Sequence, residues 1–533
     1  MEKKTSFLKG AFILTVAGFI VKILGAVYRI PLAMMIKDEG MGLYQMAYPI
    51  YVTLLSLSTA GLPTAISKLV SSNIALKKYK NAFRIFRVSL AFLGIIGFLS
   101  TAALIIYAPY LSARVLGNPK AYYSLVSIAP AIFFVSIMSS FRGFFQGLQD
   151  MTPSAISQVV EQIGRVATVF FLASLLLPKG VEYAAAGAAF GPVVGAVLGL
   201  LVLVAVYYRK QNEIKIKMME DLEKRLDSPI KIFKDLMIFA VPITLGGLII
   251  PVMNLADAAI VPMRLQVAGF SVTRATELYG QLTGMAAPLI NLPAIVTISL
   301  SASLVPAISE AVATNNYKLA SERARLGIRI ALIFAIPAAV GLFALATPVS
   351  VLLYKNAEAG IPLSILAWGI IFLSLQQTTT GILQGVGRAA VPVYNLLLGA
   401  VTKIITNYVL TAIPSINIRG AALGTVLGYA VASLLNLAAA SRYSGMRVDF
   451  VKMILKPGIS ALFMGAFVVY SFNFLVLKGP GHNLSTLLSI MIGVLVYLFC
   501  LLILGGIEES ELTMMPFGKR LSKIIKKISL LRR

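Results

Sequence analysis

Long apolar stretches constrain this chain more than any other feature. Runs of about twenty apolar residues recur along it, and each is long enough to cross a hydrocarbon core of roughly 30 Å as a helix. Hydrophobic residues make up 58% of the 533 residues, charged residues only 13%, and the mean hydropathy is +0.87. A soluble domain carries about 25% charged residues. The sequence therefore predicts an all-α, polytopic membrane protein.

Apolar windows between charged or Gly/Pro-rich breaks predict fourteen transmembrane helices. Six precede a polar linker and eight follow it. We expect these helices near residues 6–36, 42–72, 85–108, 121–148, 154–178, 182–208, 233–263, 276–312, 325–346, 361–386, 389–412, 419–441, 454–476 and 484–505.

The positions of the basic residues predict the orientation of the chain. If the N-terminus lies in the cytoplasm, most of the 47 lysines and arginines fall in cytoplasmic segments, as the positive-inside bias requires. The net charge of +26 is then a topology signal and needs no nucleic-acid partner. We expect cytoplasmic N- and C-termini.

Four short motifs recur in the same order at offsets of 233 to 242 residues. GAAFGPVVG returns as GAALGTVLG, FQGL as LQGV, GLYQ as ELYGQ, and LPTAIS as VPAIS. The repeat predicts two pseudo-symmetric six-helix lobes around a central cleft, with two helices left over. We expect an N-lobe over residues 1–208, a cytoplasmic linker over 209–232, a C-lobe over 233–445, the two extra helices over 446–506 and a basic tail over 507–533.

The basic tail places its apolar residues on one helical face. Seven lysines and arginines from Pro516 onward cover the rest of the helix surface. This is typical of an interfacial helix on a leaflet of anionic lipids. A disordered basic end that only enforces topology is the alternative.

Two basic residues of the first predicted helix, Lys22 and Arg29, are the main candidates for headgroup binding. They are seven residues apart, two turns along one face. A charge inside the membrane costs roughly 2.5–3.5 kcal/mol on insertion scales, and two cations facing a cleft suit a diphosphate. Alternatively, Arg29 snorkels to the surface and Lys22 pairs with a carboxylate.

Asp257 is the acidic residue well inside the seventh predicted helix, with Asn254 one turn before it. The repeat makes this helix the counterpart of the first. Asp257 is therefore predicted either to ligate a coupling cation, to close an outer gate by pairing with Arg29, or to act as a structural counter-ion.

Further candidates lie on the second, fourth, fifth and eighth predicted helices. Glu161 and Arg165 are four residues apart, the spacing at which they pair, and Arg165 either binds substrate or serves only that pair. Arg142 and Gln146 either meet an entering headgroup or reflect the positive-inside bias.

Lys68 and Glu310 occupy equivalent cytoplasmic helix ends and form either an inner gate or two snorkelling charges. The chain has one cysteine, Cys500, and one histidine, His482, which exclude a cysteine metal cluster and a multi-histidine site. Phosphate-binding loops of the P-loop type and nucleophile elbows are absent from the sequence, so we expect no enzymatic activity.

Several segments resemble one known family. They are KILGAVYRIPL, EGMGLYQMAYPIY and LPTAISKLV between Phe7 and Ser72, then SSFRGFFQGLQDMTP from Ser139 and SQVVEQIGRV from Ser157. These segments resemble the stage V sporulation protein B group of Gram-positive bacteria. That group belongs to the polysaccharide-transporter branch of the multidrug/oligosaccharidyl-lipid/polysaccharide flippase superfamily, together with the lipid II flippases.

The resemblance implies a multi-pass protein of the bacterial cytoplasmic membrane whose two extra helices form a groove for a polyprenyl tail. It implies a flippase that moves a polyprenyl-diphosphate-linked cell-envelope precursor, lipid II or a related oligosaccharide lipid, to the outer leaflet by alternating access. Its expected partners are the lipid-linked saccharide, anionic lipids and envelope-synthesis proteins, and no cofactor is expected, with a coupling cation left open. The alternatives are a cation-coupled multidrug exporter of the same superfamily and a non-transporting scaffold in envelope or spore assembly.

Overall fold

The computed structural model describes residues 2–506, except residues 60, 220, 222–225, 448 and 480. Of the described residues, 89% are helical and none belongs to a strand. Helices pair every backbone N–H and C=O internally, which is what the bilayer core demands. The predicted all-α membrane fold is confirmed. The predicted basic tail, residues 507–533, lies outside the described residues.

Among the described residues, twelve segments are long and apolar enough to cross a membrane, or thirteen if one bent pair of helices counts as a span. One segment, Val16–Ala75, contains 60 residues, is divided between α1, α2 and α3, and covers two predicted spans. The backbone leaves helical geometry inside this segment at Lys37, where φ is 55° and ψ is −167°. The predicted count of fourteen is not confirmed, and several predicted stretches are divided between consecutive helices, such as residues 121–148 between α5 and α6.

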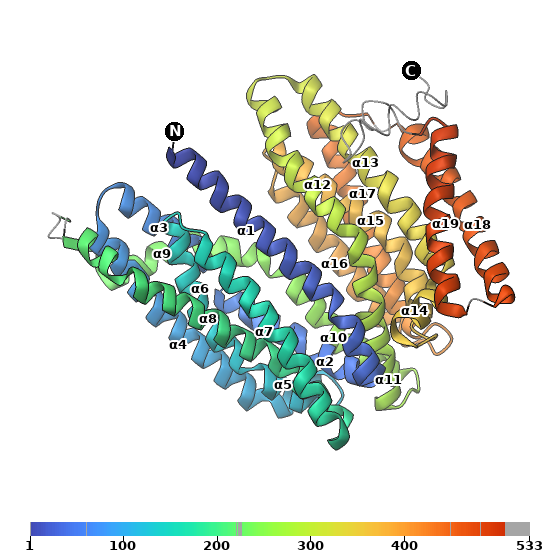
Figure 1. Cartoon of the computed structure of the whole chain (residues 1–533), viewed down its shortest axis with the longest axis horizontal. Helices are drawn as coiled ribbons and strands as arrows, with labels where there is room; N and C mark the ends of the chain where they lie inside the picture. Colours follow the sequence, from blue (N-terminus) through green and yellow to red (C-terminus); the bar gives the residue numbers. More distant parts are fainter. Residues whose placement is uncertain are drawn as a thin grey trace. The chain divides into compact units, whose positions relative to one another are not determined.

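The chain folds as two compact units, Met1–Gly280 and Gln281–Arg533. Unit 1 holds the helices coloured from blue to light green in Figure 1. Its elements are α1 (Glu2–Val27), α2 (Arg29–Thr59), α3 (Leu62–Ala75), α4 (Tyr79–Tyr110), the π-helix Leu111–Val115, α5 (Ala121–Ile128), α6 (Pro130–Gly147), α7 (Thr152–Leu176), the 3-10 turn Leu177–Lys179, α8 (Val181–Met219), α9 (Pro229–Gly247), α10 (Ile249–Val267) and α11 (Val272–Gly280).

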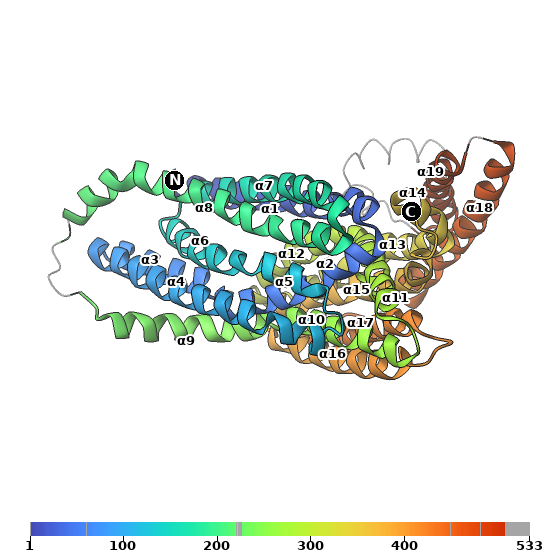
Figure 2. The same ribbon diagram turned by 90° about the horizontal axis from the view of Figure 1, so that it is seen from below.

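Within unit 1, α7 packs along α8, and α1 packs against α7. Helix α2 contacts α5, α8, α10 and α11. Helix α9 lies beside α3 and α4, on the side opposite α7 and α8 in Figure 2. Aromatic rings fill the space between α4, α6 and α8, with Phe86 stacked 4.5 Å from Phe144 and 5.6 Å from Tyr207. Unit 1 therefore has its own core.

Unit 2 contains the remaining helices. They are the π-helix Gln281–Ala286, α12 (Ala287–Ala313), α13 (Tyr317–Ala344), α14 (Ala346–Tyr354), α15 (Gly360–Gly385), α16 (Ala390–Leu410), α17 (Ile418–Ser444), the π-helix Val451–Leu455, α18 (Lys456–Lys478) and α19 (His482–Ile503). Helix α15 packs against α12, α13 and α17, and α16 packs against α17.

The two helices outside the sequence repeat, α18 and α19, pack against each other and against α13. The hydroxyl of Tyr497 on α19 donates a hydrogen bond of 2.8 Å to the carbonyl of Ile333 on α13. The buried guanidinium of Arg329 donates one of 3.0 Å to the carbonyl of Gly506. These bonds tie the extra helices to the rest of unit 2.

Glycines hold equivalent helix pairs together in both units. A Cβ added at Gly187 on α8 would lie 2.9 Å from the Leu172 carbonyl oxygen on α7. In unit 2, a Cβ at Gly420 on α17 would lie 2.9 Å from the Leu410 carbonyl oxygen on α16. Small residues let helices approach closely in membranes. The repeated GAA(F/L)G motif therefore builds the same close contact twice.

A second pair of equivalent contacts lies just before the FQGL and LQGV motifs. On α6, a Cβ at Gly143 would lie 2.9 Å from the Pro63 carbonyl oxygen on α3. On α15, a Cβ at Gly381 would lie 2.8 Å from the Ser301 carbonyl oxygen on α12. Gly143 and Gly381 are 238 residues apart in the sequence, and so are Pro63 and Ser301. The internal repeat of the sequence is thus a repeat of local structure.

The predicted lobe boundary differs from the boundary between the compact units. Helices α9, α10 and α11 follow the linker over residues 209–232, yet they belong to unit 1 and contact α2, α3 and α4. A sequence repeat reports which helices are alike, whereas compactness depends on which helices touch. The predicted lobes, residues 1–208 and 233–445, stay a prediction based on the repeat.

Candidate functional site

Arg29 begins α2 directly after a one-residue turn at Tyr28. Its side chain is half-buried, and its Nε is buried without a hydrogen-bond partner among the described residues. The hydroxyl of buried Tyr28 lies 3.2 Å from the hydroxyl of Tyr44. Arg29 interacts electrostatically with Tyr28, Tyr44 and Tyr48. The predicted binding residue therefore lies among tyrosine hydroxyls and has hydrogen-bonding capacity to spare.

A row of tyrosines on α2 extends this site. Tyr44, Tyr48 and Tyr51 lie on one helical face, and successive rings are 5.8 Å apart. Tyr48 and Tyr51 interact electrostatically with Arg165 on α7. Our sequence predictions did not include these tyrosines. Their spacing of four and three residues in GLYQMAYPIY was the signal that pointed to one face.

Glu161 on α7 joins two arginines. Its Oε1 accepts a hydrogen bond of 2.9 Å from Arg165, and its Oε2 accepts one of 2.9 Å from Arg142 on α6. The Nε of Arg142 also donates to the hydroxyl of Ser157 at 3.1 Å. The three ionised side chains are only 14–16% exposed. The predicted Glu161–Arg165 pair is present, and the structure adds Arg142 to it.

Helix α8 fixes the position of this ion-pair network. A Cβ at Gly195 would lie 2.5 Å from the Glu161 carbonyl oxygen, and one at Gly191 would lie 3.0 Å from that of Arg165. In unit 2, a Cβ at Gly424 would correspondingly lie 3.2 Å from the Lys403 carbonyl oxygen. Lys403 lies 238 residues after Arg165 and is therefore its structural counterpart. The half-buried Arg165 and the buried Lys403 both stand on helices that pack against a glycine face.

The cluster in unit 1 is strongly cationic. Arg29, Arg142 and Arg165 carry three positive charges and Glu161 one negative charge, which leaves a net charge of +2. The Nε of Arg165 and the amide Nε2 of Gln162 are buried and have no hydrogen-bond partner among the described residues. Guanidinium groups bind phosphate oxygens through two parallel N–H bonds. The arrangement suits an anion rich in oxygen atoms.

Two other predicted headgroup residues contribute less to this geometry. Lys22 lies on α1, but its side chain is outside the described part of the structure. Gln146 lies one turn after Arg142 on α6 and is half-buried. Their roles in binding stay predictions.

The predicted outer-gate residues lie on α10. Asp257 is half-buried there, and Asn254, one turn earlier, is exposed. The pairing of Asp257 with Arg29 and the binding of a coupling cation both stay predictions. Among the described residues, no three His, Cys, Asp or Glu side chains are grouped so as to hold a metal ion.

The predicted inner-gate residues each have a neighbour in their own unit. The ammonium of Lys68 on α3 lies 3.5 Å above the ring of Phe239 on α9. Glu310 on α12 pairs with Arg323 on α13 at 3.1 Å. Both Lys68 and Glu310 are exposed. The gate between them stays a prediction.

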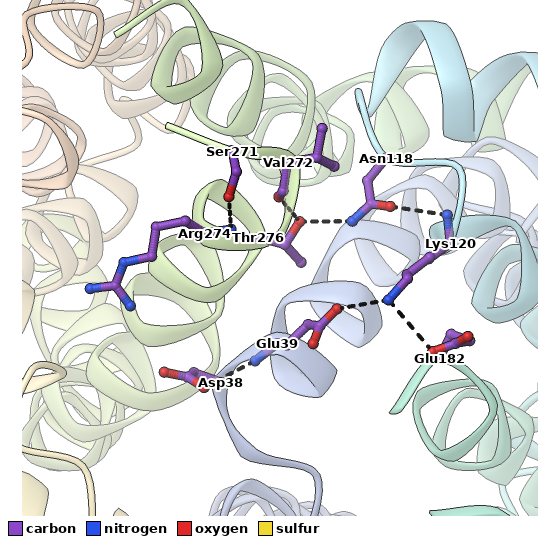
Figure 3. Close-up of polar contacts among 9 residues, drawn as sticks. All are labelled: Asp38, Glu39, Asn118, Lys120, Glu182, Ser271, Val272, Arg274 and Thr276. Carbon is purple, nitrogen blue, oxygen red and sulfur yellow. Dashed lines mark hydrogen bonds and ion pairs between the residues drawn. The ribbon is translucent and has the colours of Figure 1, made fainter. Parts of the chain in front are cut away.

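Polar contacts join four segments at one end of unit 1, as Figure 3 shows. The ammonium of Lys120 lies 3.2 Å from Glu39 on α2 and 3.8 Å from Glu182 on α8. Its hydrogen bond to Glu39 raises the pKa of Lys120 above the ordinary value. The buried amide of Asn118 donates to the hydroxyl of Thr276 on α11 at 2.8 Å. This end of the unit is therefore held by specific polar bonds.

Helices α2 and α11 cross at the same end with backbone in contact. A Cβ at Gly42 would lie 2.2 Å from the Thr276 carbonyl oxygen, and one at Gly280 would lie 2.1 Å from that of Asp38. Asp38 and Thr276 are 238 residues apart, and so are Gly42 and Gly280. The two contacts are therefore related by a local pseudo-two-fold axis. Gly280 is the structural counterpart of Gly42 in the repeat.

Residues 7–312, more than half of the chain, match the family described as "Polysaccharide biosynthesis protein". The chain belongs to this polysaccharide biosynthesis protein family. Residues 283–409 also match the family described as "MatE". The predicted resemblance is confirmed.

Two relatives from Bacillus subtilis (strain 168) align over nearly the whole chain. The "Stage V sporulation protein B" is 31% identical over 97% of this chain and 99% of the relative. The "Lipid II flippase MurJ" is 29% identical over 95% of this chain and 96% of the relative. As a member of the polysaccharide biosynthesis protein family with bacterial relatives of this kind, the chain is a multi-pass membrane protein.

Two solved structures share the fold. A "Lipid II flippase MurJ, inward closed conformation" has a TM-score of 0.68 at 16% identity, covering 92% of this chain and 98% of that one. An inward-facing "multidrug resistance MATE family transporter of the MOP superfamily" also has a TM-score of 0.68, at 15% identity, covering 82% of this chain and 98% of that one. One relative is named as a lipid II flippase, and the two solved structures are a flippase and a transporter, so the prediction that the chain is not an enzyme is confirmed.

Proposed function

We propose that the protein is a flippase for a polyprenyl-diphosphate-linked cell-envelope precursor, such as lipid II or a related oligosaccharide lipid. The observation that carries this proposal is the cluster of Arg29, Arg142 and Arg165 beside a row of tyrosines inside a transporter fold. Buried guanidinium Nε atoms without partners are costly, so a site that keeps them favours an anionic ligand. The similarity to a protein named as a lipid II flippase supports the same substrate class.

The chemistry of the cluster matches both parts of such a headgroup. Arginines bind the diphosphate through charge-assisted hydrogen bonds. The tyrosine face of α2 offers flat rings and hydroxyls, which suit the apolar faces and hydroxyls of sugar rings. A purely apolar pocket would reject this headgroup, because its charges would lose their hydration without replacement.

Translocation follows an alternating-access scheme, in which the site faces each leaflet in turn while the polyprenyl tail stays in lipid. Helices α18 and α19 lie outside the repeat and supply the tail groove. The N- and C-termini lie in the cytoplasm, as the positive-inside bias favours. The driving force is the membrane potential, worth roughly 2.3 kcal/mol per charge per 100 mV, or a coupled cation.

The second candidate is a cation-coupled multidrug exporter, which the match to the MatE family favours. An exporter of cationic drugs requires acidic groups to dominate the site. Here the four ionised side chains of the cluster have a net charge of +2, so a cationic drug is repelled. The charge balance supports the flippase.

Reconstitution in liposomes tests the proposal. Full-length protein is inserted with an undecaprenyl-diphosphate saccharide that carries a fluorescent headgroup, and a membrane-impermeant quencher reports the leaflet. We expect wild-type protein to accelerate transfer and Arg29→Ala to reduce the rate to that of empty liposomes. If the protein transfers no polyprenyl-diphosphate saccharide but exports a cationic dye, the exporter is established instead.

A further inference from the structure

Glu161 is placed as an anion between two cations. Each of its carboxylate oxygens accepts one hydrogen bond of 2.9 Å, from Arg142 on α6 and from Arg165 on α7. The three side chains are 14–16% exposed, so water screens this network only weakly. One carboxylate therefore occupies the point where two guanidinium groups from different helices converge.

The cations around Glu161 are not saturated by it. Arg165 keeps a buried Nε, and Gln162 a buried Nε2, with no acceptor among the described residues. The Nε of Arg29 is in the same condition. Native structures pair most such groups. Five side-chain nitrogens of the described residues are buried without a partner, and three of the five belong to Arg29, Gln162 and Arg165. The site thus offers more donors than one carboxylate has oxygen atoms to fill.

We propose that Glu161 is an internal substitute for a phosphate group, which holds Arg142 and Arg165 in place until the diphosphate of the substrate displaces it. This inference rests on the proposed function. A diphosphate carries at least two charges and more oxygen atoms than a carboxylate. It therefore satisfies both arginines and the donors that Glu161 leaves unpaired, which drives the exchange.

The surroundings determine how the exchange takes place. Ser157 accepts the Nε–H of Arg142 at 3.1 Å, so that guanidinium keeps its orientation when the carboxylate leaves. Helix α7 itself is held by α8, because a Cβ at Gly195 would already lie 2.5 Å from the Glu161 carbonyl oxygen. The side chain of Glu161 therefore moves while its backbone stays in place.

Displacement has a consequence for transport. A site that bound the diphosphate without competition would release it slowly. Glu161 remains tethered beside the arginines and competes for them at high local concentration. It therefore weakens binding and promotes release, which returns the empty site to its starting state.

Binding to the full chain in nanodiscs tests this role, with farnesyl diphosphate as the probe. Glu161→Gln keeps the shape of the side chain but removes its charge. We expect it to bind the probe at least about tenfold more tightly than wild type, equivalent to about 1.4 kcal/mol, and to transport the lipid-linked substrate more slowly. A purely structural carboxylate predicts the opposite sign, because its loss would leave the arginines poorly positioned.

Two further variants keep the test decisive. Glu182→Gln removes a glutamate that pairs with Lys120 at 3.8 Å, outside the cluster, and should bind as wild type does. The side chain of Glu161→Asp is too short to bridge both arginines, so this variant should tighten binding by a smaller factor. It replaces the glutamine variant if that variant does not fold. If wild type binds the probe and both Glu161 variants bind it no more tightly, the role of Glu161 is overturned and the proposed function stays intact. Absence of diphosphate binding in wild type and in both variants overturns the proposed function as well.

Discussion

Gly280→Ala should open the crossing of α2 and α11. The added methyl group would lie 2.1 Å from the Asp38 carbonyl oxygen and 2.6 Å from the Gly42 amide nitrogen. Both neighbours are backbone atoms, which cannot rotate away as a side chain can. The two helices must therefore separate at this point, and the conformation in which they touch loses stability.

The structure sets the size of the effect. Overpacking a close contact costs about 1–3 kcal/mol. Alanine also favours helix over glycine by about 0.8–1 kcal/mol, but this gain is the same whether or not the helices touch, so it cancels in the conformational equilibrium. The population with separated helices should rise by roughly 5- to 150-fold.

Cysteine labelling measures this shift. The reporter is Ala275→Cys on α11, a fully buried position beside the crossing, in a chain whose native Cys500 is replaced by serine. A membrane-impermeant maleimide should label it faster when Gly280→Ala is added. Gly94→Ala on α4 is the matched control, because a Cβ there has no neighbour within 4 Å. Equal labelling rates in folded Gly280→Ala and its parent would refute the reasoning.

Three further predictions follow from the same structure. Arg29→Ala should weaken diphosphate binding by roughly 10- to 150-fold, and Arg29→Lys should recover part of the loss, because an ammonium lacks the planar fork; titration in nanodiscs measures this. Asn118→Ala breaks a buried hydrogen bond to Thr276 and should cost about 1–3 kcal/mol, seen as a lower melting temperature in detergent. Hydrogen bonds, the strongest from Lys231, hold the pKa of Asp227 below its ordinary value. The ionised Asp227 therefore stabilises the folded protein above pH ~4, and this contribution is lost as pH falls through the lowered pKa. Asp227→Asn should therefore flatten the acid limb of a melting-temperature profile.

Each of these predictions has an outcome that contradicts it. Diphosphate binding by Arg29→Ala at wild-type affinity would remove Arg29 from the site. Asn473→Ala alters an exposed asparagine on α18, and a melting temperature lowered as much by it as by Asn118→Ala would show that burial is not the cause. An unchanged acid limb in Asp227→Asn would show that other carboxylates govern it.

The sequence predicted the arginines but not their surroundings. A charge in an apolar run is conspicuous, so Arg29, Arg165 and Glu161 were all found without coordinates. The spacing of four residues also predicted the pair between Glu161 and Arg165. Arg142 joins that pair from another helix, and no local spacing encodes a contact between helices. Tyrosines, in contrast, are common enough in membrane helices that the row on α2 carried too weak a signal.

Hydropathy alone determined that the chain crosses a membrane as helices, because a bilayer leaves the backbone few other ways to pair its polar groups. The repeated glycine motifs similarly determined that two sets of helices are alike. Only the tertiary structure decided which carbonyls those glycines face, and that Gly42 and Gly280 meet each other. It also decided that α9, α10 and α11 pack with unit 1. Such contacts depend on the approach of helices far apart in the chain, and the close distance between two backbones is a property of the pair, which neither segment specifies by itself.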